Sequence, residues 1–110
     1  MNLIELQQQV AAWNKKNFPD GTPDRVLIGA GEELGELFHA HLKQSQGIRG
    51  TDAEHRAAAK DAIGDICIYL MAYCAKRGFQ FDSCIRGAWD EVKNRNWKRN
   101  RKDGKNVRMD

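Results

Sequence analysis

The segment that most restricts the fold is an apolar run from residue 62 to residue 75, AIGDICIYLMAYCA, in which Asp65 is the only charged residue. An isolated ionised carboxylate in such surroundings is costly unless it is paired or coordinates a metal ion. No basic residue lies within the run to pair with it. The run therefore predicts a helix with apolar surroundings, whose single carboxylate, Asp65, binds a cation.

A second acidic cluster, Glu32-Glu33-Leu34-Gly35-Glu36, precedes this run. If its helix continues to about Gln46, it extends ~15 Å beyond the cluster, and a return helix from residue 52 to residue 61 rises ~14 Å. The two acidic clusters are then expected at the same height on neighbouring antiparallel helices. Residues three or four apart share a helix face. Four hard oxygen ligands that suit Mg²⁺ or Mn²⁺ rather than zinc are predicted to converge there: Glu33, Glu36, Asp61 and Asp65.

Helix signals divide the chain into four segments. The first is expected over residues 2–17, the second from Thr22 and Pro23 to residue 46, and the third from the Thr51 capping box to Gly78. The fourth is expected to be capped by Asp82 or Ser83 and to run to about residue 97. No segment alternates with period two, so the predicted fold is all-α, a four-helix domain over residues 1–97 followed by a basic, flexible tail over residues 98–110.

Helical spacing also predicts which residues are covered. Trp89 is expected in the core, and His55 is expected on the surface of the first turn of its helix. The third helix is apolar on nearly every side, and a chain of 110 residues has too little helix to surround it. We therefore expect part of this helix to pack against another subunit of a homo-oligomer, a dimer or a tetramer.

Composition indicates a soluble domain, with 41% hydrophobic and 30% charged residues. No apolar run reaches the roughly 18 residues that cross a bilayer, so no membrane association is expected. The start, MNLIELQQQV, has neither a basic beginning nor a cleavage-site pattern. Cys67 and Cys74 would lie ~10 Å apart on one helix, too far for a disulfide. These features favour a reducing, cytoplasmic location.

Charge is distributed unevenly along the chain. Residues 1–92 hold ten basic and thirteen acidic residues, whereas residues 93–110 hold eight basic and two acidic ones. Such a basic end implies an anionic partner. One interpretation is a nucleic-acid-binding or regulatory helical module that uses this end. No helix-turn-helix pattern supports it, and aromatic residues among the basic ones are limited to Trp97, so nucleic acid is the less favoured partner.

The two motifs together, GEELGEL and then DAIGDICIYL, resemble the MazG-like all-α nucleoside triphosphate pyrophosphatases, including the dCTP pyrophosphatase and dimeric dUTPase relatives. The resemblance covers about residues 3–97. It also rests on Trp13 in the first helix, on Arg25 and Leu27 before the acidic cluster, and on the residues Lys93, Asn94 and Arg95 near the predicted end of the fourth helix.

The resemblance implies an enzyme that hydrolyses a nucleoside triphosphate to the monophosphate and pyrophosphate, in control of nucleotide pools. Glu33 and Glu36 would be catalytic as well as metal ligands. Lys93, Asn94 and Arg95 would bind the substrate, and Trp13 would stack on the base, although packing in the core is an equally good interpretation of this tryptophan.

One ligand departs from the family motif, Glu-x-x-Glu followed by Glu-x-x-Asp. Glu33, Glu36 and Asp65 match it, but the third acid of the motif falls on Ala62. Asp61 lies one residue earlier and only ~40° from Asp65 around the helix, so we expect it to replace the missing glutamate. The alternative is a site of three protein carboxylates and water, with Asp61 solvated.

Overall fold

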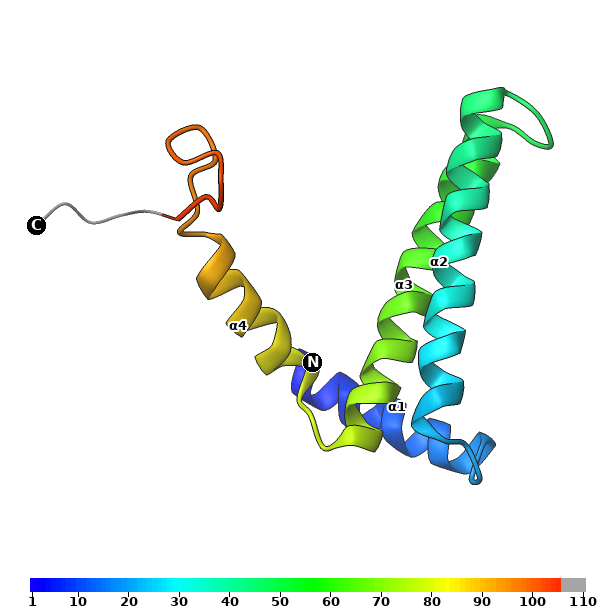
Figure 1. Cartoon of the computed structure of the whole chain (residues 1–110). Coiled ribbons are helices and arrows are strands. Elements are labelled where there is room, and N and C mark those ends of the chain that lie inside the picture. The colour runs from blue at the N-terminus through cyan, green and yellow to red at the C-terminus, as the bar shows by residue number, and fades with distance from the viewer. Residues whose placement is uncertain (106–110) are drawn as a thin grey trace, which may run out of the picture.

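The computed structural model describes residues 1–105, which fold into four α-helices and no strand: α1 (Leu3–Asn17), α2 (Pro23–Gln46), α3 (Asp52–Arg77) and α4 (Phe81–Val92). Helices α2 and α3 lie side by side as a long antiparallel hairpin, α1 crosses the base of this hairpin, and α4 diverges from it (Figure 1). The all-α class with four helices is confirmed. Within the described residues, none of the helices is both long enough and apolar enough to cross a membrane.

The ends of the α2–α3 hairpin follow the cap residues in the sequence. The Thr22 side chain accepts a hydrogen bond from the backbone N–H of Arg25, and Pro23 occupies the first position of α2. Thr51 and Glu54 form the complete capping box at the start of α3. Gly47 and Gly78 end the two helices with φ of 68° and 71°, a left-handed conformation that glycine adopts without steric cost. The predicted boundaries of both helices are confirmed.

The fourth helix differs from its prediction at both ends. It begins at Phe81 with no side-chain cap, and it ends at Val92 rather than near residue 97. The Asn94 side chain donates to the backbone carbonyl of Asp90 (2.9 Å), and the backbone N–H of Asn96 donates to the carbonyl of Gly104 rather than to the preceding helical turn. Asparagine favours such local bonds over the helix interior.

Residues 93–105 consequently form a chain of turns beyond α4. Gly104 is buried and lies so close to the Trp97 ring that a Cβ there would be 2.8 Å from it. The Asn100 side chain donates to Asp103 (2.9 Å). The segment predicted as a flexible tail therefore makes hydrogen bonds and contacts as far as residue 105, and its residues 106–110 lie outside the described part of the chain.

Gln7 of α1 holds the connection between α3 and α4. Its side-chain amide donates to the carbonyl of Phe79 (2.9 Å) and accepts from the backbone N–H of Phe81 (2.7 Å). The second bond satisfies a backbone donor at the start of α4 that has no side-chain cap of its own.

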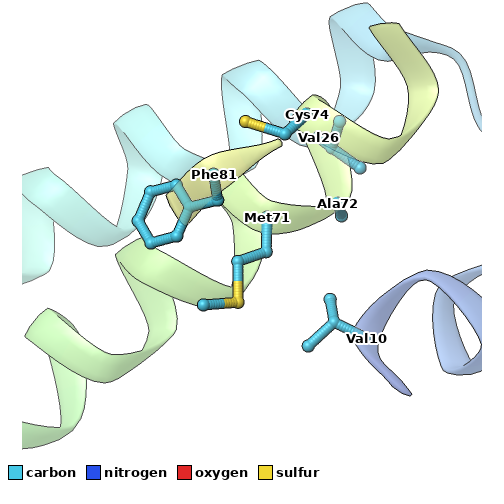
Figure 2. Packing of buried hydrophobic residues seen from close by; sticks show 6 residues of the cluster. All are labelled: Val10, Val26, Met71, Ala72, Cys74 and Phe81. Carbon is cyan, nitrogen blue, oxygen red and sulfur yellow. The ribbon is translucent and has the colours of Figure 1, made fainter. Parts of the chain in front are cut away.

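The hydrophobic core lies where α1, the hairpin and the first residue of α4 meet. Figure 2 shows its six buried members, Val10, Val26, Met71, Ala72, Cys74 and Phe81. This core is small for the chain. The radius of gyration is 18.0 Å, whereas a compact domain of this length has about 13 Å. Because α2 and α4 do not contact each other in the described residues, one chain does not close into a bundle.

Large apolar side chains remain exposed on all four helices. They are Leu3, Ile4 and Trp13 of α1, Leu27, Ile28, Leu34, Phe38 and Leu42 of α2, Ile63 and Ile68 of α3, and Ile85, Trp89 and Val92 of α4. The predicted core position of Trp89 is therefore wrong for the single chain, because none of the four described helices packs over its face of α4. His55 was also misplaced: it is buried, and its Nε2 donates to the carbonyl of Ile48 (2.9 Å).

The capping box of α3 generates a pH-dependent prediction. The pKa of Glu54 lies below its ordinary value of 4.5 because its carboxylate accepts hydrogen bonds from Thr51, first from the backbone N–H. A lowered pKa in the folded state gives stability that is present above the unfolded-state pKa and lost as the pH falls through the folded one. We expect Glu54→Gln to lower the free energy of unfolding at pH 7, and the difference from wild type to shrink below about pH 4.5 in urea titrations.

Glu5 provides the matched control. It occupies the same third position of α1, and its backbone N–H donates to the Asn2 side chain. Its own carboxylate makes no hydrogen bond within the described residues. Glu5→Gln should therefore show a smaller loss. Equal losses for the two variants at every pH would contradict the role of the capping box.

Candidate functional site

The hairpin brings the two acidic clusters to one level. The pKa of Glu33 is raised above 4.5, first by loss of solvation and then by repulsion from Asp65 across the helix pair and from Glu36, Glu32 and Asp61. Glu33 of α2 and Asp65 of α3 also line the same pocket. The matching heights predicted from the helix lengths are therefore confirmed for this pair.

The same register extends along the seam between α2 and α3. Val26 and Ala72 belong to the same core cluster, and Glu33 and Asp65 line the same pocket. The second pair lies seven residues further along each helix, in opposite chain directions. Seven residues of helix rise ~10 Å. The seam thus joins an apolar end, next to α1, to an acidic end about two helical turns away.

The four predicted ligands divide into two pairs by exposure. Glu33 and Asp65 are half-buried and line one pocket, whereas Glu36 and Asp61 are exposed. Glu36 lines a separate depression together with His39. The structure therefore brings Glu33 and Asp65 together in a cavity wall and leaves the other two acids at its margin.

None of these four carboxylates has a partner within the described residues, by ion pair or by side-chain hydrogen bond. The ion pairs of the described chain are all on or next to α4: Arg86–Asp82, Lys93–Asp90 and Arg95–Glu91. The donor chemistry is that of a hard divalent ion. As placed, however, no group of three or more His, Cys, Asp or Glu side chains in residues 1–105 is close enough to hold a metal ion. Glu36 and Asp61 would have to turn towards Glu33 and Asp65 to complete such a site.

The pocket that contains Glu33 and Asp65 has a volume of about 610 Å³ and extends along the seam to α1. Its wall is mostly apolar and aromatic, as in small-molecule sites generally. Four groups of residues line it: Trp13 and Asn14 of α1; Phe18 and Gly21 of the loop that follows α1; Arg25, Val26 and Glu33 of α2; and Asp65, Ile68, Tyr69 and Ala72 of α3.

Trp13 forms the outer aromatic wall of this pocket. Its side chain is 54% exposed and meets Phe18 edge-on, with ring centroids 6.0 Å apart and an interplanar angle of 72°. The core interpretation of Trp13 is therefore wrong. A large aromatic face left open beside a cavity can stack on a flat ligand, so base stacking stays a prediction.

Tyr69 forms the inner wall, and its position depends on Gly29. A Cβ built on Gly29 of α2 would lie 2.3 Å from the Tyr69 ring, which means that the ring lies directly against the helix backbone. No other residue leaves that space. The glycine therefore sets both the spacing of the two helices at this point and the shape of the pocket.

The predicted phosphate-binding residues lie elsewhere. Lys93, Asn94 and Arg95 follow the end of α4, and none of them lines the pocket. Lys93 pairs with Asp90 (3.0 Å), and Arg95 pairs with Glu91 (3.1 Å). Within one chain, the structure does not bring these residues to the acidic cluster.

Sequence reasoning missed two polar residues of the pocket, Asn14 and Tyr69. Tyr69 follows Asp65 by four residues and so shares its helix face. Asn14 follows Val10 by four residues and so falls on the buried face of α1. A polar residue on a buried face was the available signal for Asn14, and the helical spacing from Asp65 was the signal for Tyr69.

Comparison with protein-family models, with curated proteins and with solved structures found no match to this chain. The geometry of the site and the two acidic motifs are therefore what indicate a function.

The contact between Gly29 and Tyr69 leads to a prediction about the pocket. Gly29→Ala should displace Tyr69 and lower the free energy of unfolding by roughly 1–3 kcal/mol, the usual cost of overpacking. Gly31→Ala is the control, because a Cβ there has no atom within 4 Å in the described residues, and it should stabilise the chain by roughly 0.5–1 kcal/mol. Urea unfolding measures both, and a Gly29→Ala protein as stable as Gly31→Ala would contradict the close packing.

Proposed function

We propose that this chain is a metal-dependent nucleoside triphosphate pyrophosphohydrolase of the MazG-like type, acting in nucleotide-pool control. The observation that carries the proposal is the pair Glu33 and Asp65, which lie half-buried in the wall of an aromatic pocket and have no cationic partner among residues 1–105. Carboxylates in this situation are expected to bind a cation.

Mg²⁺, or Mn²⁺ in its place, is the proposed cofactor. Glu33 and Asp65 would hold it, with Glu36 and Asp61 turned inwards from the margin. A divalent ion in such a site supplies charge neutralisation for the polyphosphate and acidifies water at neutral pH. Glu36 is proposed to orient the attacking water and to accept its proton. The bond between the α- and β-phosphates breaks, which leaves the monophosphate and pyrophosphate.

The pocket offers a place for the nucleoside beside the acidic end. Trp13 would stack on the base, and Arg25, which lines the same pocket, adds a positive charge near the phosphates. The seam is ~10 Å long from the acids to the apolar end. This length leaves room for the sugar between the base at Trp13 and the phosphates at the acids.

The proposed protein is a homo-oligomer. Exposed Leu, Ile, Phe and Trp side chains cover faces of α2 and α4, and apolar surface of this extent marks an interaction site. A second chain packed on these faces would cover them and bring its Lys93, Asn94 and Arg95 to the acids of the first chain. This arrangement accounts for substrate-binding residues that lie away from the pocket of their own chain.

A nucleic-acid-binding module is the second candidate. In its favour, Lys98, Arg99, Arg101 and Lys102 lie together in the turns after α4 and form no ion pairs within the described residues. Binding to an oligonucleotide, with an affinity that falls steeply as salt is added, together with no nucleotide hydrolysis, would favour this candidate over the enzyme.

The enzymatic function is tested with a panel of nucleoside triphosphates and Mg²⁺. We expect phosphorus NMR to show monophosphate and pyrophosphate, and thermal unfolding to show stabilisation by the ion, by about 2.7 kcal/mol at a concentration 100 times its Kd. Glu33→Gln with Asp65→Asn should remove both effects. Asp24→Asn, an acid of the first turn of α2 outside the pocket, should remove neither.

Two results would contradict this assignment, and a third measurement distinguishes two forms of the site. Turnover that survives exhaustive chelation would exclude the metal site. Diphosphate and orthophosphate as products would exclude the proposed reaction. Asp61→Asn distinguishes the two forms of the site: a weaker affinity for Mg²⁺ indicates that Asp61 is a ligand, and an unchanged affinity indicates three protein carboxylates and water.

Arg95 tests the shared site. We expect Arg95→Ala to lower kcat/KM by roughly 10-fold, or about 1.4 kcal/mol of transition-state binding, although Arg95 is remote from the pocket of its own chain. Arg101→Ala, an exposed arginine of the same turns, is the control and should have little effect. Light scattering should give a dimer or tetramer, and a fully active monomer would contradict the arrangement.

A further inference from the structure

Asn14 is a buried polar residue that the structure leaves unpaired. Its side chain, on the inner face of α1, is only 6% exposed, and its Oδ1 atom has no hydrogen-bond partner in the part of the chain that the structure describes. No described residue bonds to its amide nitrogen either. A buried acceptor without a partner costs roughly 1–3 kcal/mol, and native folds contain few of them.

Stability alone does not account for an amide at this position. Val10, one helical turn earlier, is part of the hydrophobic core, and an apolar residue of similar size at position 14 would extend that core without the cost of an unpaired oxygen. Leucine also has the higher helix propensity. The amide is therefore a liability in the chain by itself, and a bound molecule that pairs with it would remove the cost.

The neighbours of Asn14 indicate what that molecule is. Asn14 lines the same pocket as Trp13, Phe18 and Tyr69, at the end of the seam away from the acids. A flat ring that stacks on an aromatic side chain there presents its polar edge to residues of the wall. A carboxamide has one acceptor and one NH₂ donor side by side, so it matches an edge that has a donor next to an acceptor. Nucleobases have such edges, and asparagine pairs with them through two bonds.

We infer that Asn14 is the specificity-determining residue of this pocket and hydrogen-bonds to the edge of the nucleobase of the bound nucleotide. This inference rests on the proposed function and deepens it. The acids hold the polyphosphate end through the ion, Trp13 stacks on the base whatever its identity, and Asn14 distinguishes bases by their donor and acceptor pattern. A site that hydrogen-bonds to its substrate rejects analogues that leave its buried groups unpaired.

The test is calorimetric binding of non-hydrolysable analogues of the four deoxynucleoside triphosphates, and of inorganic tripolyphosphate, in the presence of Mg²⁺. We expect wild type to prefer one base. Asn14→Leu should lower the affinity for that analogue by roughly 10-fold or more, should reduce the differences among the four, and should leave tripolyphosphate binding unchanged. Without nucleotide, Asn14→Leu should be at least as stable as wild type.

Two further variants make the result specific. Gln9→Leu makes a similar polar-to-apolar change on the exposed face of α1 and should leave all affinities unchanged. Asn14→Asp keeps the shape but replaces the NH₂ donor with an oxygen, so it should change the order of base preference, and it remains informative if the leucine variant does not fold.

The outcomes separate this inference from the proposed function. If wild type binds nucleotides and tripolyphosphate, but both Asn14 variants keep its base preference, then Asn14 does not read the base and the proposed function stands. An Asn14→Leu protein that loses tripolyphosphate along with every nucleotide indicates a purely structural role and also overturns the inference. If wild type binds neither nucleotide nor tripolyphosphate, the proposed function fails and the inference fails with it.

Discussion

The close packing of α2 on α3 is the contact on which the rest of the structure depends. Where Gly29 meets Tyr69, the ring of one helix lies against the backbone of the other, and this contact sets the spacing and the register of the hairpin. The register places Glu33 beside Asp65 and closes the inner wall of the pocket. The Lys76 side chain adds a hydrogen bond to the carbonyl of Gly21 (2.8 Å), which holds the loop between α1 and α2 at the rim of the same pocket.

Two polar residues of the pocket, Glu33 and Asn14, lower the stability of the fold that forms it. Glu33 is partly desolvated and faces like charges, and its raised pKa means that its contribution to stability falls as the pH rises through that pKa. Asn14 adds a buried, unpaired oxygen at the other end. Both costs lie in one cavity, whereas ion pairs elsewhere in the described chain are concentrated around α4. Functional sites commonly keep groups that the fold by itself would not favour.

Helix α4 shows how much the isolated chain leaves open. It is joined to the rest by the Gln7 hydrogen bonds and by Phe81 in the core, and it then diverges from the hairpin (Figure 1). Ile85, Trp89 and Val92, an apolar stripe with helical spacing, remain exposed along it. Helical periodicity identifies the face that is buried but not the chain that covers it, and for this reason it predicts Trp89 in the core of a single chain.

Local chemistry determined most of what the sequence predicted correctly. Thr22, Pro23, Thr51 and the glycines at positions 47 and 78 act through bonds within a few residues, so the lengths of α2 and α3, and hence the equal heights of the acidic clusters, could be derived from the sequence. Tertiary structure decided the rest, because it depends on contacts between residues far apart in the chain. It placed Glu33 and Asp65, but not Glu36 and Asp61, in the pocket wall, and it buried Asn14 without a partner among the described residues.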